Sequence, residues 1–88
     1  MDYLLFTYPN CVKCEAMKKT LAESQTAYAE YSLTSPPGKA KIREFLNVIK
    51  RDESGAIKLP TLIAHTQGIV RGVLNTAEEF EDWSRSKA

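Results

Sequence analysis

A Cys-x-x-Cys motif, from Cys11 to Cys14, lies between an apolar segment and a segment rich in helix formers. Residues 3–8, Tyr-Leu-Leu-Phe-Thr-Tyr, are of aromatic and aliphatic types that favour a buried β-strand. Residues 15–23 contain no Gly or Pro and are mostly good helix formers, and the Pro-Asn pair at 9–10 is typical of a turn. The sequence therefore predicts that the first cysteine lies at the start of a helix and the second one turn into it.

The predicted position of these cysteines suits thiol chemistry. Unpaired N–H groups and the helix dipole at a helix start favour negative charge, and the thiolate is the reactive form of cysteine. We therefore expect the pKa of the Cys11 thiol to be lowered, with the charge of Lys13 adding to the effect. Cys14 would then attack a mixed disulfide formed at Cys11, because two sulfurs one helical turn apart can join without moving the chain far.

The length and charge of the chain restrict the classes of protein it can belong to. Its 88 residues predict one small domain spanning residues 1–88. The 12 basic and 11 acidic side chains nearly cancel, so no strong field directs the protein toward nucleic acid or a membrane. The N-terminus lacks the basic region of a signal peptide, and no stretch is long enough to span a bilayer. We expect a cytoplasmic monomer, in which such a cysteine pair is catalytic or metal-binding rather than structural.

Runs of β-branched, aromatic and aliphatic residues predict four strands. They span residues 2–8, 27–33, 61–65 and 69–71. The helix at the cysteine motif, over residues 12–24, connects the first two strands, which should therefore be parallel with a right-handed crossover. A Gln-Gly turn at residues 67–68 joins the last two strands, which should form a hairpin.

Periodicity and capping signals predict two further helices. In one segment apolar residues recur with the i, i+3, i+4, i+7 spacing of an amphipathic helix, at Ile42, Phe45, Leu46 and Ile49. The last helix should begin near Thr76, which fits a capping box with Glu79. The predicted order is β-α-β-α-β-β-α, a four-stranded mixed sheet with three helices.

Leu59 and Pro60 open the third predicted strand, where the missing N–H of a proline is tolerated. The Cys-x-x-Cys motif and this proline, in this order of elements, resemble the thioredoxin superfamily and most closely its glutaredoxin branch. The resemblance extends over essentially the whole chain and implies a thioredoxin-like α/β fold. It also implies a cis bond before Pro60, a proline that faces the cysteines, and a Leu59 backbone that pairs with the substrate.

The same resemblance implies glutathione as a co-substrate, with no bound cofactor and no metal. Glutaredoxins hold glutathione beside a Gly-Gly turn and the start of the last helix, which correspond here to Arg71, Gly72 and Asn75, with Lys13 as a further contact. This sequence has Arg71 in place of one glycine and Asn75 where an acidic residue often lies. Tyr8 replaces a lysine, and it either faces the substrate or packs in the sheet. These departures affect glutathione recognition more than thiol chemistry, and Arg71 and Lys58 are either glutathione contacts or ordinary surface charges.

The sequence therefore predicts a glutaredoxin-like thiol-disulfide oxidoreductase that reduces protein disulfides or glutathione mixed disulfides. Cys11 attacks, and Cys14 or glutathione resolves the intermediate. The alternative is a non-catalytic metal-binding or carrier module, for example a dimer whose four thiolates hold one metal ion, since His65 is the only other obvious soft ligand. A third interpretation is a partner protein of thioredoxin fold that has lost useful redox activity.

Overall fold

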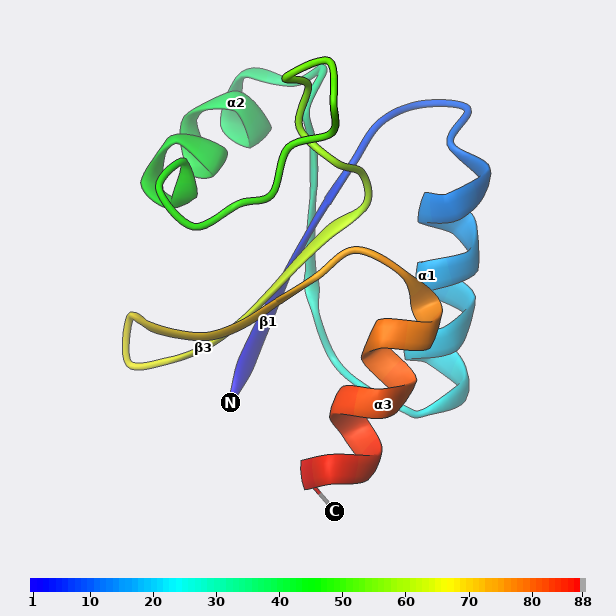
Figure 1. The fold of residues 1–88 in the computed structure, drawn as a ribbon. Coiled ribbons are helices and arrows are strands. Elements are labelled where there is room, and N and C mark those ends of the chain that lie inside the picture. The colour runs from blue at the N-terminus through cyan, green and yellow to red at the C-terminus, as the bar shows by residue number, and fades with distance from the viewer. Residues whose placement is uncertain (88) are drawn as a thin grey trace.

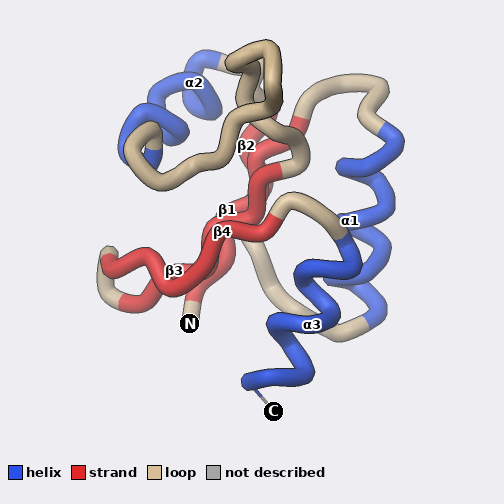
Figure 2. Tube along the Cα trace, in the orientation of Figure 1, coloured by secondary structure: helices blue, strands red, loops and turns tan. Residues whose placement is uncertain are grey.

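The computed structural model describes residues 1–87 and contains one four-stranded sheet with helices on both faces (Figures 1 and 2). In chain order the elements are β1 (Asp2–Thr7), α1 (Val12–Glu23), β2 (Ala29–Ser32), α2 (Pro36–Ile42), the 3₁₀ turn η1 (Arg43–Phe45), β3 (Thr61–Thr66), β4 (Ile69–Leu74) and α3 (Ala77–Lys87). The strand order is β2-β1-β3-β4, with β1 parallel to β2 and antiparallel to β3, and β3 antiparallel to β4. The predicted order of elements and the mixed sheet are confirmed.

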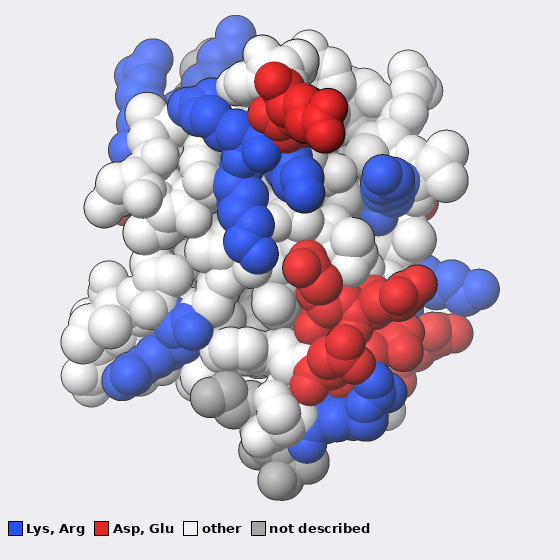
Figure 3. All heavy atoms as spheres, viewed as in Figure 1, with Lys and Arg blue, Asp and Glu red and all other residues white. Residues whose placement is uncertain are grey.

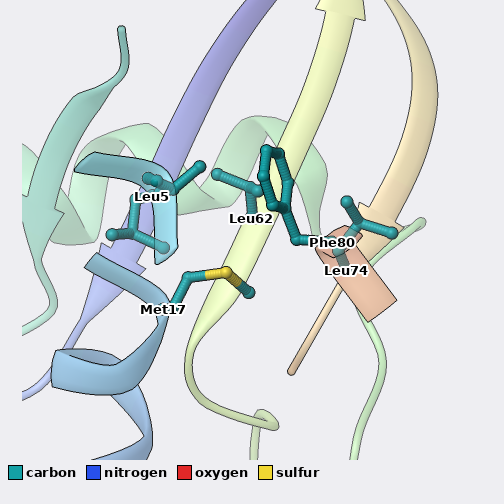
Figure 4. Close-up of a cluster of buried hydrophobic side chains, with 6 residues drawn as sticks. Leu5, Met17, Leu62, Leu74 and Phe80 are labelled. Atoms are coloured by element: carbon teal, nitrogen blue, oxygen red, sulfur yellow. The ribbon is translucent and has the colours of Figure 1, made fainter. Parts of the chain in front are cut away.

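Side-chain alternation along the strands divides the core into two layers. On the face covered by α1 and α3, Met17 and Phe80 from these helices pack against strand side chains, namely Leu5, Leu62 and Leu74 (Figure 4). On the face covered by α2, the buried cluster consists of Leu4, Phe6, Ile42 and Ile63. Each fully buried side chain of this size contributes about 1.5–3 kcal/mol. The first layer fixes α1, and with it the cysteine motif, against the end of β1.

The segment that follows β2 differs from its prediction. The apolar spacing predicted one helix reaching Ile49, but the α-helix ends at Ile42 and the chain continues as the 3₁₀ turn η1. Phe45 and Ile49 still pack against the α2-side cluster. Because a 3₁₀ turn also brings residues i and i+3 to one side, the spacing alone cannot distinguish the two conformations. The strand predicted over residues 27–33 is likewise shorter, spanning Ala29–Ser32.

The start of α3 is a complete capping box, as predicted. The backbone N–H of Glu79 donates to Thr76 Oγ1 over 3.0 Å, and the N–H of Thr76 donates to Glu79 Oε1 over 3.1 Å. The N–H of Asn75 donates to the same carboxylate oxygen over 2.6 Å. The Glu79 side chain thus holds two backbone amides that would otherwise be unpaired before the helix. No helix in the described part of the chain is long and apolar enough to cross a membrane.

Candidate active site

The two cysteines are joined by a disulfide across the first turn of α1. Cys11 is the N-cap residue, with extended backbone angles, and its Sγ accepts a hydrogen bond of 3.1 Å from the N–H of Cys14. Their Cα atoms lie 5.2 Å apart. Cys11 is half-buried, whereas Cys14 is only 1% exposed. The predicted positions, one cysteine at the start of the helix and one a turn inside it, are confirmed.

The turn between β1 and α1 places Cys11 beyond the C-terminal end of β1, an inner strand of the sheet. Asn10 has a φ of 59°, in the left-handed region, which asparagine tolerates better than most side chains. The conformation reverses the chain directly after β1, so that α1 begins beside the end of the strand. Tyr8, in the same turn, is 53% exposed. The packing interpretation of this tyrosine is therefore wrong, because its side chain lies largely outside the sheet core.

A cavity of about 580 Å³ lies on the side of the disulfide that faces β2, and we call it the β2-side cavity. Its lining includes Cys11 and Tyr8 together with three charged side chains, Glu15, Lys18 and Glu30. Lys18 Nζ lies 2.8 Å from a Glu15 carboxylate oxygen and 3.2 Å from Glu30 Oε2. These hydrogen bonds, first that to Glu15 and then that to Glu30, raise the pKa of Lys18 above 10.5. One ammonium group is thus shared between two carboxylates in the cavity that Cys11 also lines.

Thr7, the last residue of β1, joins this ion network from the sheet. Its side chain is buried, and its Oγ1 donates to Glu30 Oε2 over 2.9 Å. No local pattern in the sequence points to Thr7, Lys18 and Glu30 as neighbours, because they belong to three different elements. The signal that could have found them is the parallel pairing of β1 with β2, in which Thr7 lies opposite Ser32, two residues from Glu30. The hydroxyl and the carboxylate meet only through that register.

A second cavity, of about 230 Å³, lies on the other side of the motif and is called here the Pro60-side cavity. Lys13, Leu59 and Asn75, which the sequence predicted as site residues, line it together with Lys58. The bond between Leu59 and Pro60 is cis, as expected. The structure therefore brings together three of the predicted binding residues, from the cysteine motif, the proline loop and the start of α3.

Asp52 also lines the Pro60-side cavity, at the turn that precedes the proline loop. Its Oδ1 accepts hydrogen bonds from the hydroxyl of Ser54 over 2.6 Å, from the N–H of Ser54 over 2.9 Å and from the N–H of Ala56 over 3.1 Å. These bonds, that from the Ser54 hydroxyl above all, lower the pKa of Asp52 below 3.8. Hydrogen bonds to the ionised carboxylate favour that form, so this wall of the cavity carries a negative charge near neutral pH.

Arg71 and Gly72 lie apart from that cavity, inside β4. The sequence predicted that this strand ends at Arg71, but it continues to Leu74, because Gly72, Val73 and Leu74 stay paired with β3. The register shifts at this point, leaving Arg71 outside the paired positions and exposed. A Cβ built on Gly72 would lie 2.7 Å from Trp83 Cζ3, so the glycine permits close packing of α3. The expected Gly-Gly-like turn beside the last helix is therefore wrong for residues 71–72, while glutathione binding by them stays a prediction.

A metal site would need more ligands than the structure brings together. Within residues 1–87, no three His, Cys, Asp or Glu side chains are grouped so that they could hold a metal ion. Among the described residues, the Nε2 atom of His65 is buried without a hydrogen-bond partner. His65 is paired with Asp2 at the start of β1, whereas the disulfide follows the end of that strand. One copy of the described chain thus offers at most the two thiolates of the motif.

The chain is similar to known proteins in its fold but not detectably in its sequence. No family model matches it, and no curated protein sequence matches it significantly. Among solved structures, it is similar to the glutaredoxin-like protein NrdH-redoxin from Escherichia coli, with a TM-score of 0.61 and 16% identity over 90% of this chain and 87% of that one. It is also similar to thioredoxin 1 from the thermophilic eubacterium Thermosipho africanus TCF52B, with a TM-score of 0.60 and 13% identity over 99% and 98% of the two chains. The expected thioredoxin-like fold is thereby confirmed.

Proposed function

We propose that this chain of thioredoxin-like fold is a thiol-disulfide oxidoreductase in which Cys11 is the nucleophile and Cys14 the resolving cysteine. The observation that carries the proposal is the disulfide across the first turn of α1, with Cys11 half-buried and Cys14 buried. A sulfur at a helix N-cap receives the backbone N–H groups and the positive end of the dipole, which favour the thiolate. The more accessible cysteine is thus also the one whose anion is better stabilised.

The reaction balances as two successive exchanges. In the reduced protein, the Cys11 thiolate attacks one sulfur of a substrate disulfide, and the other substrate sulfur leaves as a thiolate that takes up a proton. Cys14 then loses its proton and attacks Cys11 Sγ, which releases the second substrate sulfur as a thiolate. The substrate gains two electrons and two protons, and the protein ends in the disulfide form described above.

Docking of the substrate is proposed to use the backbone of Leu59. Among the described residues, neither the N–H nor the C=O of Leu59 takes part in a hydrogen bond. An unpaired donor and acceptor on one residue can pair with an extended segment of another chain, as in strand addition. Leu59 lines the same cavity as Lys13, which lies between the two cysteines in the sequence, and this proximity supports its role.

We propose a protein disulfide as the principal substrate, with glutathione as a co-substrate still to be tested. Glutathione carries two carboxylates, and the side chains of Lys13 and Lys58 could receive one of them. However, the N–H groups of Asn75 and Thr76 are already bonded to the Glu79 carboxylate. Acidic side chains also gather over α3 on the face shown in Figure 3. The similar NrdH-redoxin of Escherichia coli is a glutaredoxin-like protein described by its thioredoxin-like activity profile, which agrees with this preference.

One experiment tests the function and the reductant together. Reduced protein is mixed with a protein disulfide and, separately, with a glutathionylated peptide, with either glutathione or thioredoxin reductase regenerating it. We expect turnover of the protein disulfide with thioredoxin reductase, and slower turnover with glutathione. Absence of turnover with both substrates and both reductants would overturn the proposed function. Faster turnover with glutathione than with thioredoxin reductase would overturn only the expected reductant, and faster turnover of the glutathionylated peptide than of the protein disulfide would overturn only the substrate preference.

A further inference from the structure

The side-chain amide of Asn75 bonds to the two carbonyl groups that flank Leu59. Asn75 Nδ2 lies 3.2 Å from the carbonyl oxygen of Lys58 and 2.9 Å from that of Pro60. The asparagine is only 7% exposed, and it lies at the start of α3, 15 residues beyond the proline. One amide group at the start of α3 therefore bonds to the proline loop on both sides of Leu59.

The donors and acceptors around Asn75 determine how its amide is oriented. Nδ2 also lies 3.3 Å from Thr61 Oγ1, and that hydroxyl gives its own proton to the Lys58 carbonyl over 2.6 Å. All three neighbours of Nδ2 are thus oxygen atoms that can accept a hydrogen bond. Reversing the amide would place Oδ1 against these oxygens, so the nitrogen must face the loop. Oδ1 is buried without a partner among the described residues.

The backbone of Asn75 is itself fixed to α3. Its N–H donates to Glu79 Oε1, and the capping box closes the first turn of the helix behind it. Phe80, in the same turn, is buried against the sheet in the α1 and α3 layer. The amide of Asn75 therefore links the proline loop to a rigid part of the core rather than to another loop.

The hydrogen bonds around Leu59 hold its neighbours and leave Leu59 itself unpaired. The N–H of Lys58 donates to the carbonyl of Lys50 over 3.0 Å. The side-chain amide of Asn75 donates to the carbonyl oxygens of Lys58 and Pro60. The Lys58 carbonyl, which shares a peptide group with the Leu59 N–H, and the Pro60 carbonyl, one peptide group beyond the Leu59 C=O, are thereby held in place. Within residues 1–87, its own N–H and C=O make no hydrogen bond. A docking segment held in this way does not have to be ordered when the substrate binds.

We propose that Asn75 is a positioning residue that holds the Leu59 backbone in the conformation that binds a protein disulfide. This inference rests on the proposed function, and it assigns Asn75 a role other than the glutathione contact expected from the sequence. The residue acts through the loop and does not touch the reacting sulfurs. Its loss should therefore weaken the binding of a substrate that has a backbone to dock, and spare the reaction of Cys11 with a small disulfide.

The test compares two substitutions at this position with matched controls. Asn75→Asp is nearly isosteric but places a carboxylate against three oxygens, and Asn75→Ser removes the amide without adding charge. Asn47→Asp makes the same chemical change at an exposed residue of the turn after η1. Leu21→Val removes a methylene from the buried core and reports what lower stability alone does to the kinetics.

For both Asn75 variants we expect the KM for the protein disulfide to rise about tenfold, which corresponds to about 1.4 kcal/mol, with kcat nearly unchanged. The rate with 2-hydroxyethyl disulfide should remain that of the wild type, as should both rates in Asn47→Asp. An unchanged KM in a folded Asn75→Ser protein would overturn the inference. The inference would also be overturned if the Asn75 variants lost activity equally toward the protein disulfide and 2-hydroxyethyl disulfide, and Leu21→Val lost both activities in the same way.

Two further measurements distinguish a failure of the positioning role from a loss of protein stability and from a failure of the proposed function. If neither variant folds, hydrogen exchange of the Asn75 side-chain amide in the wild type decides, because a bonded amide exchanges more slowly than the exposed one of Asn47. Exchange at the same rate would overturn the inference. If the wild type reduces no protein disulfide at all, the proposed function itself fails. If it does so and Asn75→Ser has the same KM, only the positioning role fails.

Discussion

The two sides of the disulfide are built in different ways. On the β2 side, charged side chains surround a cavity of about 580 Å³, where Lys18 lies between Glu15 and Glu30. On the Pro60 side, a cavity of about 230 Å³ is bordered by the proline loop, whose backbone the buried amide of Asn75 holds. One side thus depends on ion pairs between flexible side chains, and the other on hydrogen bonds to the main chain.

Because of this difference, the two sides should hold their residues in place to different extents. Ion pairs with solvent-exposed partners contribute about 0–1 kcal/mol and are screened by salt, so the β2-side network constrains its members weakly. Buried hydrogen bonds to backbone carbonyls leave unsatisfied groups when they are broken, so the Pro60 side holds its conformation strongly. The Pro60 side should therefore set how a substrate backbone docks, while the β2 side accommodates different substrate side chains.

The largest effect is expected at the sulfur that both sides share. Cys11→Ser removes the nucleophile, and disulfide reductase activity should fall to the background rate of the reductant alone. Cys14→Ser should impair dithiol reduction while leaving Cys11 able to form a stable mixed disulfide with the substrate protein, which non-reducing electrophoresis detects. Full activity in Cys11→Ser would place the chemistry outside this motif.

The next effect concerns the Pro60 side. Thr61→Val removes the fully buried hydroxyl that donates to the Lys58 carbonyl, and should lower the free energy of unfolding by about 1 kcal/mol. The KM for a protein disulfide should rise as well, because the same carbonyl flanks Leu59. Thr66→Val, at the far end of β3, is the control and should change neither quantity, as denaturant unfolding and initial rates will reveal. Equal KM values in the two variants would remove the distinction between the two sides.

A smaller effect is expected on the β2 side. Glu30→Gln removes one carboxylate from Lys18, and should lower the free energy of unfolding by about 0.2–1 kcal/mol at low salt and less at high salt. The KM for a protein disulfide should stay unchanged, because this side does not hold the docking backbone. Glu44→Gln, which breaks the ion pair of Lys41 on the far face, is the matched control. A rise in KM as large as that of the Asn75 variants would contradict the comparison.

The smallest effects depend on pH and have opposite directions on the two sides. The pKa of Lys18 is raised above 10.5, so its contribution to stability is fully present below that pH and is lost as the pH rises through the higher folded value. The pKa of Asp52 is lowered below 3.8, so its contribution is present above that pH and is lost as the pH falls through the lower folded value. The stability difference between wild type and Lys18→Met should therefore shrink at alkaline pH, and that between wild type and Asp52→Asn at acidic pH. Denaturant unfolding across the pH range measures both, and a Lys18→Met difference that grows as the pH rises through the alkaline range would contradict the assignment.

The sequence predicted the features that depend on local signals. The strand before Cys11, the start of α1 and the capping box of Thr76 and Glu79 each follow from neighbouring residues, and all three are confirmed. The extended β4 was missed because its last residues are held by pairing with β3 and by close packing of Gly72 against Trp83. These contacts are between segments that no local pattern relates.

The two sides of the site also differed in how far they could be predicted. Lys13, Leu59 and Asn75 carried signals in the sequence, from the cysteine motif, the proline and the helix start, and they line one cavity. The network of Lys18 and Glu30 carried none, because it depends on the register between β1 and β2. Similarly, Asn75 was recognised at the start of a helix, but its contacts with the proline loop follow from tertiary packing alone.

A stabilised thiolate at Cys11 is tested most directly by alkylating the reduced protein with iodoacetamide and following each cysteine by peptide mass spectrometry as the pH is raised. We expect Cys11 to react first, and at a pH well below the value of about 8.5 at which a free cysteine is half ionised. Cys14, buried a turn inside α1, should react much more slowly. Reaction of Cys14 first, or of both cysteines only in the range of a free thiol, would contradict the claim that α1 stabilises a thiolate at Cys11.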